Sequence, residues 1–481
     1  MDLITVILFL VVYYLRPQEW SGAFSTIKFA QIVMLTGLAA LFFRQRGLRL
    51  KDLFQTPHDW MVFGFWFWIV ISAPSPWTAF KENANLYIFY IVIVQTLYSI
   101  PRLRIFVGWW TGLVVTIAGL AIVSRMGFDP LESLAITDGP MRGRLVLNLS
   151  IFNNPNALGH AVVPGIAMIY YYYIWKRPMT MRLVGTGLLV LPLFCIYSTL
   201  SKGAFVAGGV TILATLAFGR PKWVQVSMLV AALMFGSGAL YSLPRMQELN
   251  KSRGDAAIQG RVAAFKHGYN MLKKTNHGVG KGGWSESFFN ANRYLKAPHS
   301  SYVMIGAELG YVGLFFLCGI FYCSLRTVMT ARTETPDEER IRRMLFVLVI
   351  SYLVSSWMVD FGYRPTFFMF TAAIAALHRH LHHIQIGERD PEPATEPDLP
   401  AWHPQLIPQP ALERAFADRG LDTKVMTLEL QPPPEAEAKV LASPTSQIAR
   451  GWNQITLFDL AATALSTYAL VRFWAYIMMR M

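Results

Sequence analysis

The chain alternates between long apolar runs and short polar connections over most of its length. Crossing a bilayer as a helix takes roughly 18 to 20 mostly apolar residues, and several runs approach or reach that length. The runs lie at residues 3–15, 26–43, 59–73, 86–100, 105–124, 157–175, 183–199, 204–218, 223–243, 301–325, 344–359 and 366–378. This pattern predicts an all-α polytopic membrane protein with about twelve transmembrane helices and one large loop at residues 244–300.

Composition agrees with this pattern and excludes a soluble protein. Hydrophobic residues make up 54% of the chain and charged residues only 15%, whereas an ordinary soluble protein has about 25% charged residues. The three cysteines, Cys195, Cys318 and Cys323, all lie inside apolar runs. We therefore expect neither a disulfide framework nor a thiolate metal site.

Basic residues are unevenly distributed between the loops. The chain has 43 Lys and Arg against 29 Asp and Glu, but the basic residues cluster at the ends of apolar runs and form no single stripe, so we expect no nucleic-acid partner. Short loops rich in Lys and Arg stay in the cytoplasm. Alternate loops hold Arg44, Arg46, Arg49, Lys51, Arg102, Arg104, Lys176, Arg177, Arg182, Arg220, Lys222, Arg326, Arg332, Arg340, Arg342 and Arg343. This alternation predicts a cytoplasmic N-terminus and an extracytoplasmic loop 244–300.

The C-terminal part differs in composition from the first 383 residues, which we take as one transmembrane domain. Residues 391–450 contain eleven of the 27 prolines and too few apolar residues for a core, so we expect residues 384–450 to be a disordered cytoplasmic tail. Within residues 451–481, the apolar stretch from Ile455 to Met479 is interrupted by Asp459 and Arg472. It is either a thirteenth span or an interfacial helix.

The loop 244–300 has the composition of an anion-binding surface, although a solvated basic face would look the same. It carries ten Lys and Arg against three acidic residues. Asp255 can cap a helix, and one face of that helix is apolar, with Ile258, Val262, Phe265, Tyr269 and Leu272 at helical spacing. Arg261 lies at the edge of this apolar face. Its guanidinium could bind a phosphate with two parallel hydrogen bonds or could extend to lipid headgroups.

A glycine-rich run follows this helix, with Gly278, Gly280 and Lys281 as candidate substrate-binding residues. The run lacks the spacing and the Ser or Thr of a nucleotide phosphate loop. Its glycines could let backbone amides approach an anion, or the run could be a flexible turn.

Four further candidates lie on the predicted outer face, one at the end of this loop and three in other segments. His299 follows Pro298 at the start of a span, and an imidazole, with an ordinary pKa near 6.5, suits a general base. Lys202 lies in a short turn between two spans, and Arg142 and Arg144 lie in the 125–156 loop. No outward loop has a paired Asp/Glu motif, so we expect no metal ion and no other cofactor.

Several of these motifs together resemble the bacterial O-antigen ligase and O-antigen polymerase family, over about residues 140–330. They are the Ser201-Lys202-Gly203 turn, Gly260-Arg261, Gly278-Val279-Gly280, His299-Ser300-x-Tyr302, Glu308-x-Gly310-x-x-Gly313 and the Asn153-Asn154-Pro155-Asn156 element. The start, Leu15-Arg16-Pro17-Gln18-Glu19, is similar to the O-glycosylation-ligase branch of that family.

The resemblance implies a metal-independent GT-C-type glycosyltransferase in the bacterial inner membrane. Its donor would be an undecaprenyl-diphosphate-linked glycan at the periplasmic face, and its acceptor a hydroxyl of a lipid, glycan or protein. Carried over to this chain, Lys202 and Arg261 would hold the diphosphate, His299 would activate the hydroxyl, and Asn156 would belong to the substrate site. The family usually has Arg at the position of Lys202, and His-Asn where this chain has His299-Ser300.

Three alternatives remain open from the sequence. A polysaccharide polymerase would join two lipid-linked repeats and differ from a ligase only in its acceptor. A lipid-linked glycan transporter would be expected to have two related halves and charges near the bilayer midplane, and no such repeat is visible. A scaffold that recruits partners through the Pro-rich tail would account only for that tail.

The charge alternation can be tested by labelling single cysteines with an impermeant thiol reagent applied from outside. We expect Ser287→Cys, in the loop 244–300, to react and Ala436→Cys, in the tail, to react only after permeabilisation. The opposite pattern would refute the predicted topology.

Overall fold

The computed structural model describes residues 2–20, 24–45, 53–136, 143–242, 256–386 and 452–480. The chain divides into two units, Met1–His382 with Asn453–Met481, and His383–Trp452. The predicted tail lies in the second unit, and almost all of it is outside the described residues. Arg142 and Asp255 are also outside the described residues.

The described residues contain helices and no strands, which confirms the predicted all-α class. Each of the twelve predicted spans corresponds to a helix. These are α1 (Asp2–Leu15), α2 (Phe29–Gln45), α4 (Pro57–Ile71), α5 (Pro76–Thr96), α6 (Ile100–Arg125), α7 (Pro155–Ile169), α8 (Met179–Thr199), α9 (Lys202–Ala217), α10 (Lys222–Ser242), α14 (Ser301–Thr330), α15 (Pro336–Ser355) and α16 (Pro365–Ile386). Helix α5 begins ten residues before the predicted span. The prediction started late because Lys81, Glu82 and Asn83 in the first turns of the helix interrupt the apolar pattern.

Among the residues that the structure describes, five helical segments are long and apolar enough to cross a membrane. They are α6, α7 together with the π-helix η5 (Tyr170–Ile174), α8, α14 and the C-terminal helix α19 (Leu457–Arg480). The number of helices that cross the membrane, twelve or otherwise, stays a prediction.

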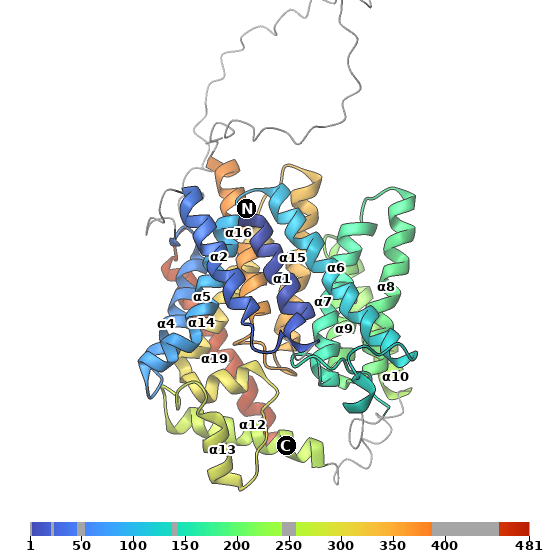
Figure 1. The fold of residues 1–481 in the computed structure, drawn as a ribbon. Coiled ribbons are helices and arrows are strands. Elements are labelled where there is room, and N and C mark those ends of the chain that lie inside the picture. Colours follow the sequence, from blue (N-terminus) through green and yellow to red (C-terminus); the bar gives the residue numbers. More distant parts are fainter. Residues whose placement is uncertain are drawn as a thin grey trace, which may run out of the picture. The chain divides into compact units, whose positions relative to one another are not determined.

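The predicted cytoplasmic loops gather at one end of the helical bundle. Arg102 at the start of α6 binds Asp2 at the start of α1, with 3.0 Å between the nitrogen and the carboxylate oxygen. Arg104 binds Asp337 at the start of α15 at 3.1 Å. The large loop folds into α12 (Ala256–Lys274) and α13 (Trp284–Asn292), and both lie at the opposite end (Figure 1). This arrangement is compatible with the predicted topology.

Helix α19 runs antiparallel to α14 along most of its length. Near its start, Asp459 binds Arg326 of α14 at 2.8 Å, and near its end Trp474 packs against Gly306 of α14 and against Tyr269 of α12. Of the two alternatives, this position favours a thirteenth span over an interfacial helix.

Candidate functional site

The turn that carries Lys202 is pressed against two other segments. Lys202 is the first residue of α9, and the Ser201 hydroxyl caps the helix by accepting from the Ala204 amide at 3.3 Å. A Cβ atom at Gly203 would lie 2.8 Å from Nε2 of His160 and 3.0 Å from Cβ of Met358. Only glycine therefore lets this turn reach His160 of α7 and the segment 356–364, which we call the α15–α16 loop.

The two residues that follow His299 bind the same α15–α16 loop. The Ser301 amide and the Ser300 hydroxyl both donate to the carbonyl oxygen of Ser356, at 2.8 and 3.1 Å. His299 itself has φ of 49°, in the left-handed region, which is unfavourable for a non-glycine residue and is often found at functional sites. The hydrogen bonds of the neighbouring residues must therefore hold the backbone of His299 in this conformation.

Arg261 of α12 lies near His299 and His160. Its charge acts on both imidazoles. For His299, burial, followed by Arg261 and Lys296, lowers the pKa to about 4, well below the ordinary value near 6.5. The imidazole of His299 is therefore neutral at pH 7 and able to accept a proton.

The structure thus brings Lys202, Arg261 and His299 into one neighbourhood, together with His160. His160 is buried, and its Nδ1 lies 3.0 Å from the hydroxyl of Ser355 at the end of α15. We did not predict His160 as a site residue. The available signal was a polar residue inside an apolar span, which is uncommon and often functional.

Two adjoining cavities open beside this cluster. The first is lined by Tyr13, Tyr14, Ile151, Phe152, Ala157, His160, Ala161, Tyr352, Val359, Asp360, Phe361, Arg364 and Thr366. The second shares Tyr13, Ile151 and Arg364, and extends between α1, α2 and α5 along Phe9, Met34, Leu86 and Phe89. Together they offer a mixed aromatic and polar chamber next to a mainly apolar cleft.

Asp360 and Arg364 are the charged residues of the first cavity, and neither was among the residues predicted from the sequence. Burial raises the pKa of Asp360 to about 6, against the opposing effect of the Arg364 guanidinium. The Arg364 side chain forms no hydrogen bond or salt bridge with any other described residue. Both residues follow a predicted span without any recognisable motif, so only the tertiary structure reveals their position.

Arg144 and Asn156 are in contact, but within a structural network. The Arg144 guanidinium donates to the Asn156 side-chain oxygen at 3.1 Å and to the carbonyl oxygen of Thr199 at 2.9 Å. Because Thr199 ends α8, three residues before Lys202, this arginine holds the start of α7 to the turn of the site.

The glycine-rich run packs against a broken turn of α14. Gly310 has φ of 66° and interrupts the helix. The Gly280 amide donates to the Glu308 carbonyl at 2.8 Å, and the Gly282 amide donates to the Glu308 carboxylate at 2.9 Å. Lys281 donates to the side chain of Asn83 and lies 5.1 Å from the ring centre of Tyr363. In this arrangement the run is a packing element, and a substrate-binding role for Gly278, Gly280 and Lys281 stays a prediction.

A helical bundle with several membrane-length helices and a cationic cluster at one end is typical of an integral membrane protein that handles an anionic substrate. Residues 187–318 match the family model described as O-antigen ligase. The match contains Lys202, Arg261 and His299, and it confirms the resemblance that we drew from the motifs. Over these residues the chain is similar to the O-antigen ligase family. No curated protein matches the chain.

The packing role of the glycine run can be tested by alanine substitution and thermal unfolding. A Cβ at Gly278 would overlap the backbone of Glu308, and its φ is +81°, so we expect Gly278→Ala to lower the Tm strongly. Gly282→Ala is the matched control, because its φ is +86° and no atom lies within 4 Å of its Cβ position. It should show the conformational cost alone, about 1 to 2 kcal/mol. Equal losses in the two variants would contradict tight packing at Gly278.

Proposed function

We propose that the protein transfers a glycan from an undecaprenyl-diphosphate-linked donor to an acceptor hydroxyl at the periplasmic face of the bacterial inner membrane. The family match supports a ligase or polymerase type of activity in general. The observation that carries the finer proposal is the convergence of Lys202, Arg261 and His299 from three separate segments at the bundle end that bears α12 and α13.

The proposed chemistry needs two functions from the protein. The acceptor oxygen forms a bond to the anomeric carbon while the bond from that carbon to the diphosphate oxygen breaks, and the hydroxyl proton passes to His299. Arg261 and Lys202 offset the negative charge that develops on the leaving diphosphate. The diphosphate is a competent leaving group, so cations and one base suffice and we expect activity to survive excess chelator.

The two cavities are placed to receive the rest of the substrates. A polyprenyl chain requires an apolar environment, which the cleft along Phe9, Met34 and Phe89 offers. The adjoining cavity, with Asp360, Arg364 and several aromatic rings, has the mixed lining of a small-molecule site, and we assign it to sugar groups. A polymerase would use the same groups with a lipid-linked acceptor, so it remains the second candidate.

Cell-envelope glycans from strains with and without the gene separate these functions. Loss of a transferase leaves lipid-linked glycan accumulated at the outer face. A ligase loss leaves full-length chains on the carrier lipid, a polymerase loss leaves single repeats, and a transporter loss leaves the glycan on the cytoplasmic side.

Substitution of the two cations tests the diphosphate contacts in a transfer assay with purified protein. Removing one preorganised donor typically costs about 2.7 to 4 kcal/mol of transition-state stabilisation, so Arg261→Ala should lower kcat/KM by about 10²- to 10³-fold and Arg261→Lys should recover part of it. Lys202→Arg should be tolerated or improved, because guanidinium binds phosphate with two hydrogen bonds.

Lys266→Ala is the matched control for the arginine, since Lys266 is an exposed cation on the same helix. It should keep nearly full activity. Near-normal activity of a folded Arg261→Ala protein would show that this arginine contacts lipid headgroups only.

The base can be identified from the pH dependence of kcat/KM, which reports the free enzyme. His299 must be unprotonated to act, and its pKa is lowered to about 4, so kcat/KM should be level above pH 5 and fall below pH 4. Bound diphosphate would offset the charge of Arg261 and raise the pKa of His299, so the corresponding fall in kcat should lie at higher pH. His299→Ala and His299→Asn should both lose about 10²- to 10⁴-fold in rate.

If Asp360 were the base, the acid limb would lie at a different pH, because burial raises the pKa of Asp360 to about 6. If His299 is the base, Asp360→Asn keeps the acid limb near pH 4 whatever its effect on the rate. An acid limb near pH 6 that disappears in Asp360→Asn, together with an active His299→Asn enzyme, would transfer the role of base to Asp360.

A further inference from the structure

A basic and aromatic cleft lies at the bundle end opposite the candidate site. It is formed where η5 ends, where α9 ends and where α15 passes, and its lining includes Trp175, Lys176, Phe218, Gly219, Arg220 and Arg343. None of these residues has a part in the proposed transfer reaction. All three cations belong to loops or helix ends that we predict to face the cytoplasm.

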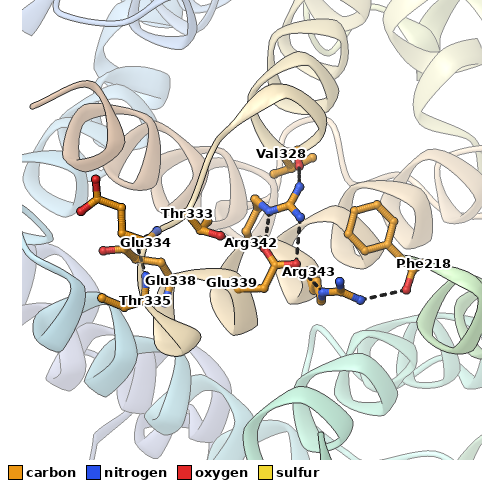
Figure 2. A network of polar contacts seen from close by, with 9 residues as sticks. All are labelled: Phe218, Val328, Thr333, Glu334, Thr335, Glu338, Glu339, Arg342 and Arg343. Carbon is orange, nitrogen blue, oxygen red and sulfur yellow. Dashed lines mark hydrogen bonds and ion pairs between the residues drawn. The ribbon is translucent and has the colours of Figure 1, made fainter. Parts of the chain in front are cut away.

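Arg343 is held rigidly at the base of this cleft. Its Nε donates to the Glu339 carboxylate at 2.6 Å, and its Nη1 donates to the carbonyl oxygen of Phe218 at 3.0 Å (Figure 2). The guanidinium carbon lies 5.0 Å from the ring centre of Trp175 and 5.5 Å from that of Phe218. Gly219, with φ of +74°, leaves the space that the guanidinium occupies. This cation is therefore fixed in place before any ligand binds.

Lys176 and Arg220 add positive charge at the rim. Both are exposed, and neither forms a salt bridge with an acidic residue in the described part of the chain. Glu339, the carboxylate that binds Arg343, also accepts from Arg342 at 2.7 and 2.9 Å, so one negative charge is shared between two arginines. The cleft thus keeps a net positive charge.

The surroundings of these cations match the headgroup region of a membrane. Aromatic rings at helix ends are typical of the boundary between headgroups and acyl chains. Leu216, 41% exposed, lies in the lining of the cleft beside these rings. Basic pockets between transmembrane helices on the cytoplasmic side are suited to anionic lipid headgroups.

We propose that this cleft binds the phosphate of an anionic phospholipid, such as phosphatidylglycerol, with its acyl chains along Leu216 and the neighbouring aromatic rings. The phosphate is bound by Lys176, Arg220 and the exposed part of Arg343. The lipid would join the ends of η5, α9 and α15. The other ends of the same helices carry Lys202 and Ser355, and α7, which η5 continues, carries His160, so an occupied cleft would fix the spacing of the helices that form the candidate site.

Native mass spectrometry of the purified full-length protein tests this binding, with dioctanoyl-phosphatidylglycerol titrated against dioctanoyl-phosphatidylcholine and against inorganic phosphate. Wild type should bind phosphatidylglycerol and prefer it to phosphatidylcholine. The double variant Lys176→Gln, Arg220→Gln should bind it about thirtyfold more weakly, which corresponds to about 2 kcal/mol.

The matched control is Lys222→Gln with Arg332→Gln, which removes two exposed cations from the same end of the bundle but outside the cleft. Its affinity should stay within about twofold of wild type. Equal loss of affinity in both double variants would show that binding depends only on net charge, and it would refute a specific site in the cleft. Equal affinity for the two lipids, or displacement of the lipid by millimolar inorganic phosphate, would overturn the phospholipid as its ligand.

Discussion

The site depends on the hydrogen bonds between the start of α14 and the loop that follows α15. The Ser301 amide donates to the carbonyl oxygen of Ser356, and the Ser301 hydroxyl accepts from the Phe361 amide at 2.7 Å. These bonds join segments about sixty residues apart and fix the backbone that forces His299 into its left-handed conformation. The same loop carries Asp360 and presses Met358 against Gly203. Without these hydrogen bonds, nothing would hold Lys202 and His299 against the same loop.

The sequence was sufficient to predict the helices and to single out three residues of the candidate site. Apolar runs predicted twelve helices because burial in lipid leaves a continuous signal in each segment. Lys202, Arg261 and His299 could be chosen as candidates because each stands in a local motif. His160, Asp360 and Arg364 were missed because each is a single polar residue without a motif. His160 contacts Ser355, and Asp360 and Arg364 line a cavity with Tyr13, so their position depends on segments far apart in the sequence. Hydropathy carries no information about such contacts.

The glycine-rich run shows how a chemically suggestive motif can have a packing function. Gly278 and Gly280 have positive φ angles, as an anion-binding loop would require. Yet their amides donate to Thr275 and to Glu308, and the run occupies the space beside the broken turn at Gly310. Two left-handed glycine segments thus interlock, which explains why the sequence has glycine at both places. A pattern of glycines alone cannot distinguish a bound phosphate from a neighbouring backbone.

The cations of this protein differ in whether the chain provides their counter-charge. Arg102, Arg104, Arg326 and Arg342 each bind a carboxylate in the protein, so their charge is used in joining helices. Arg364 in the cavity, and Lys176 and Arg220 in the cleft, bind no carboxylate among the described residues. All three side chains are exposed, so water solvates them in the free protein, and an anionic ligand would add a salt-bridge partner that the described residues do not provide. Arg364 in the first cavity, and Lys176 and Arg220 in the cleft, lie beside apolar side chains at opposite ends of the bundle, and both places leave room for an anionic ligand.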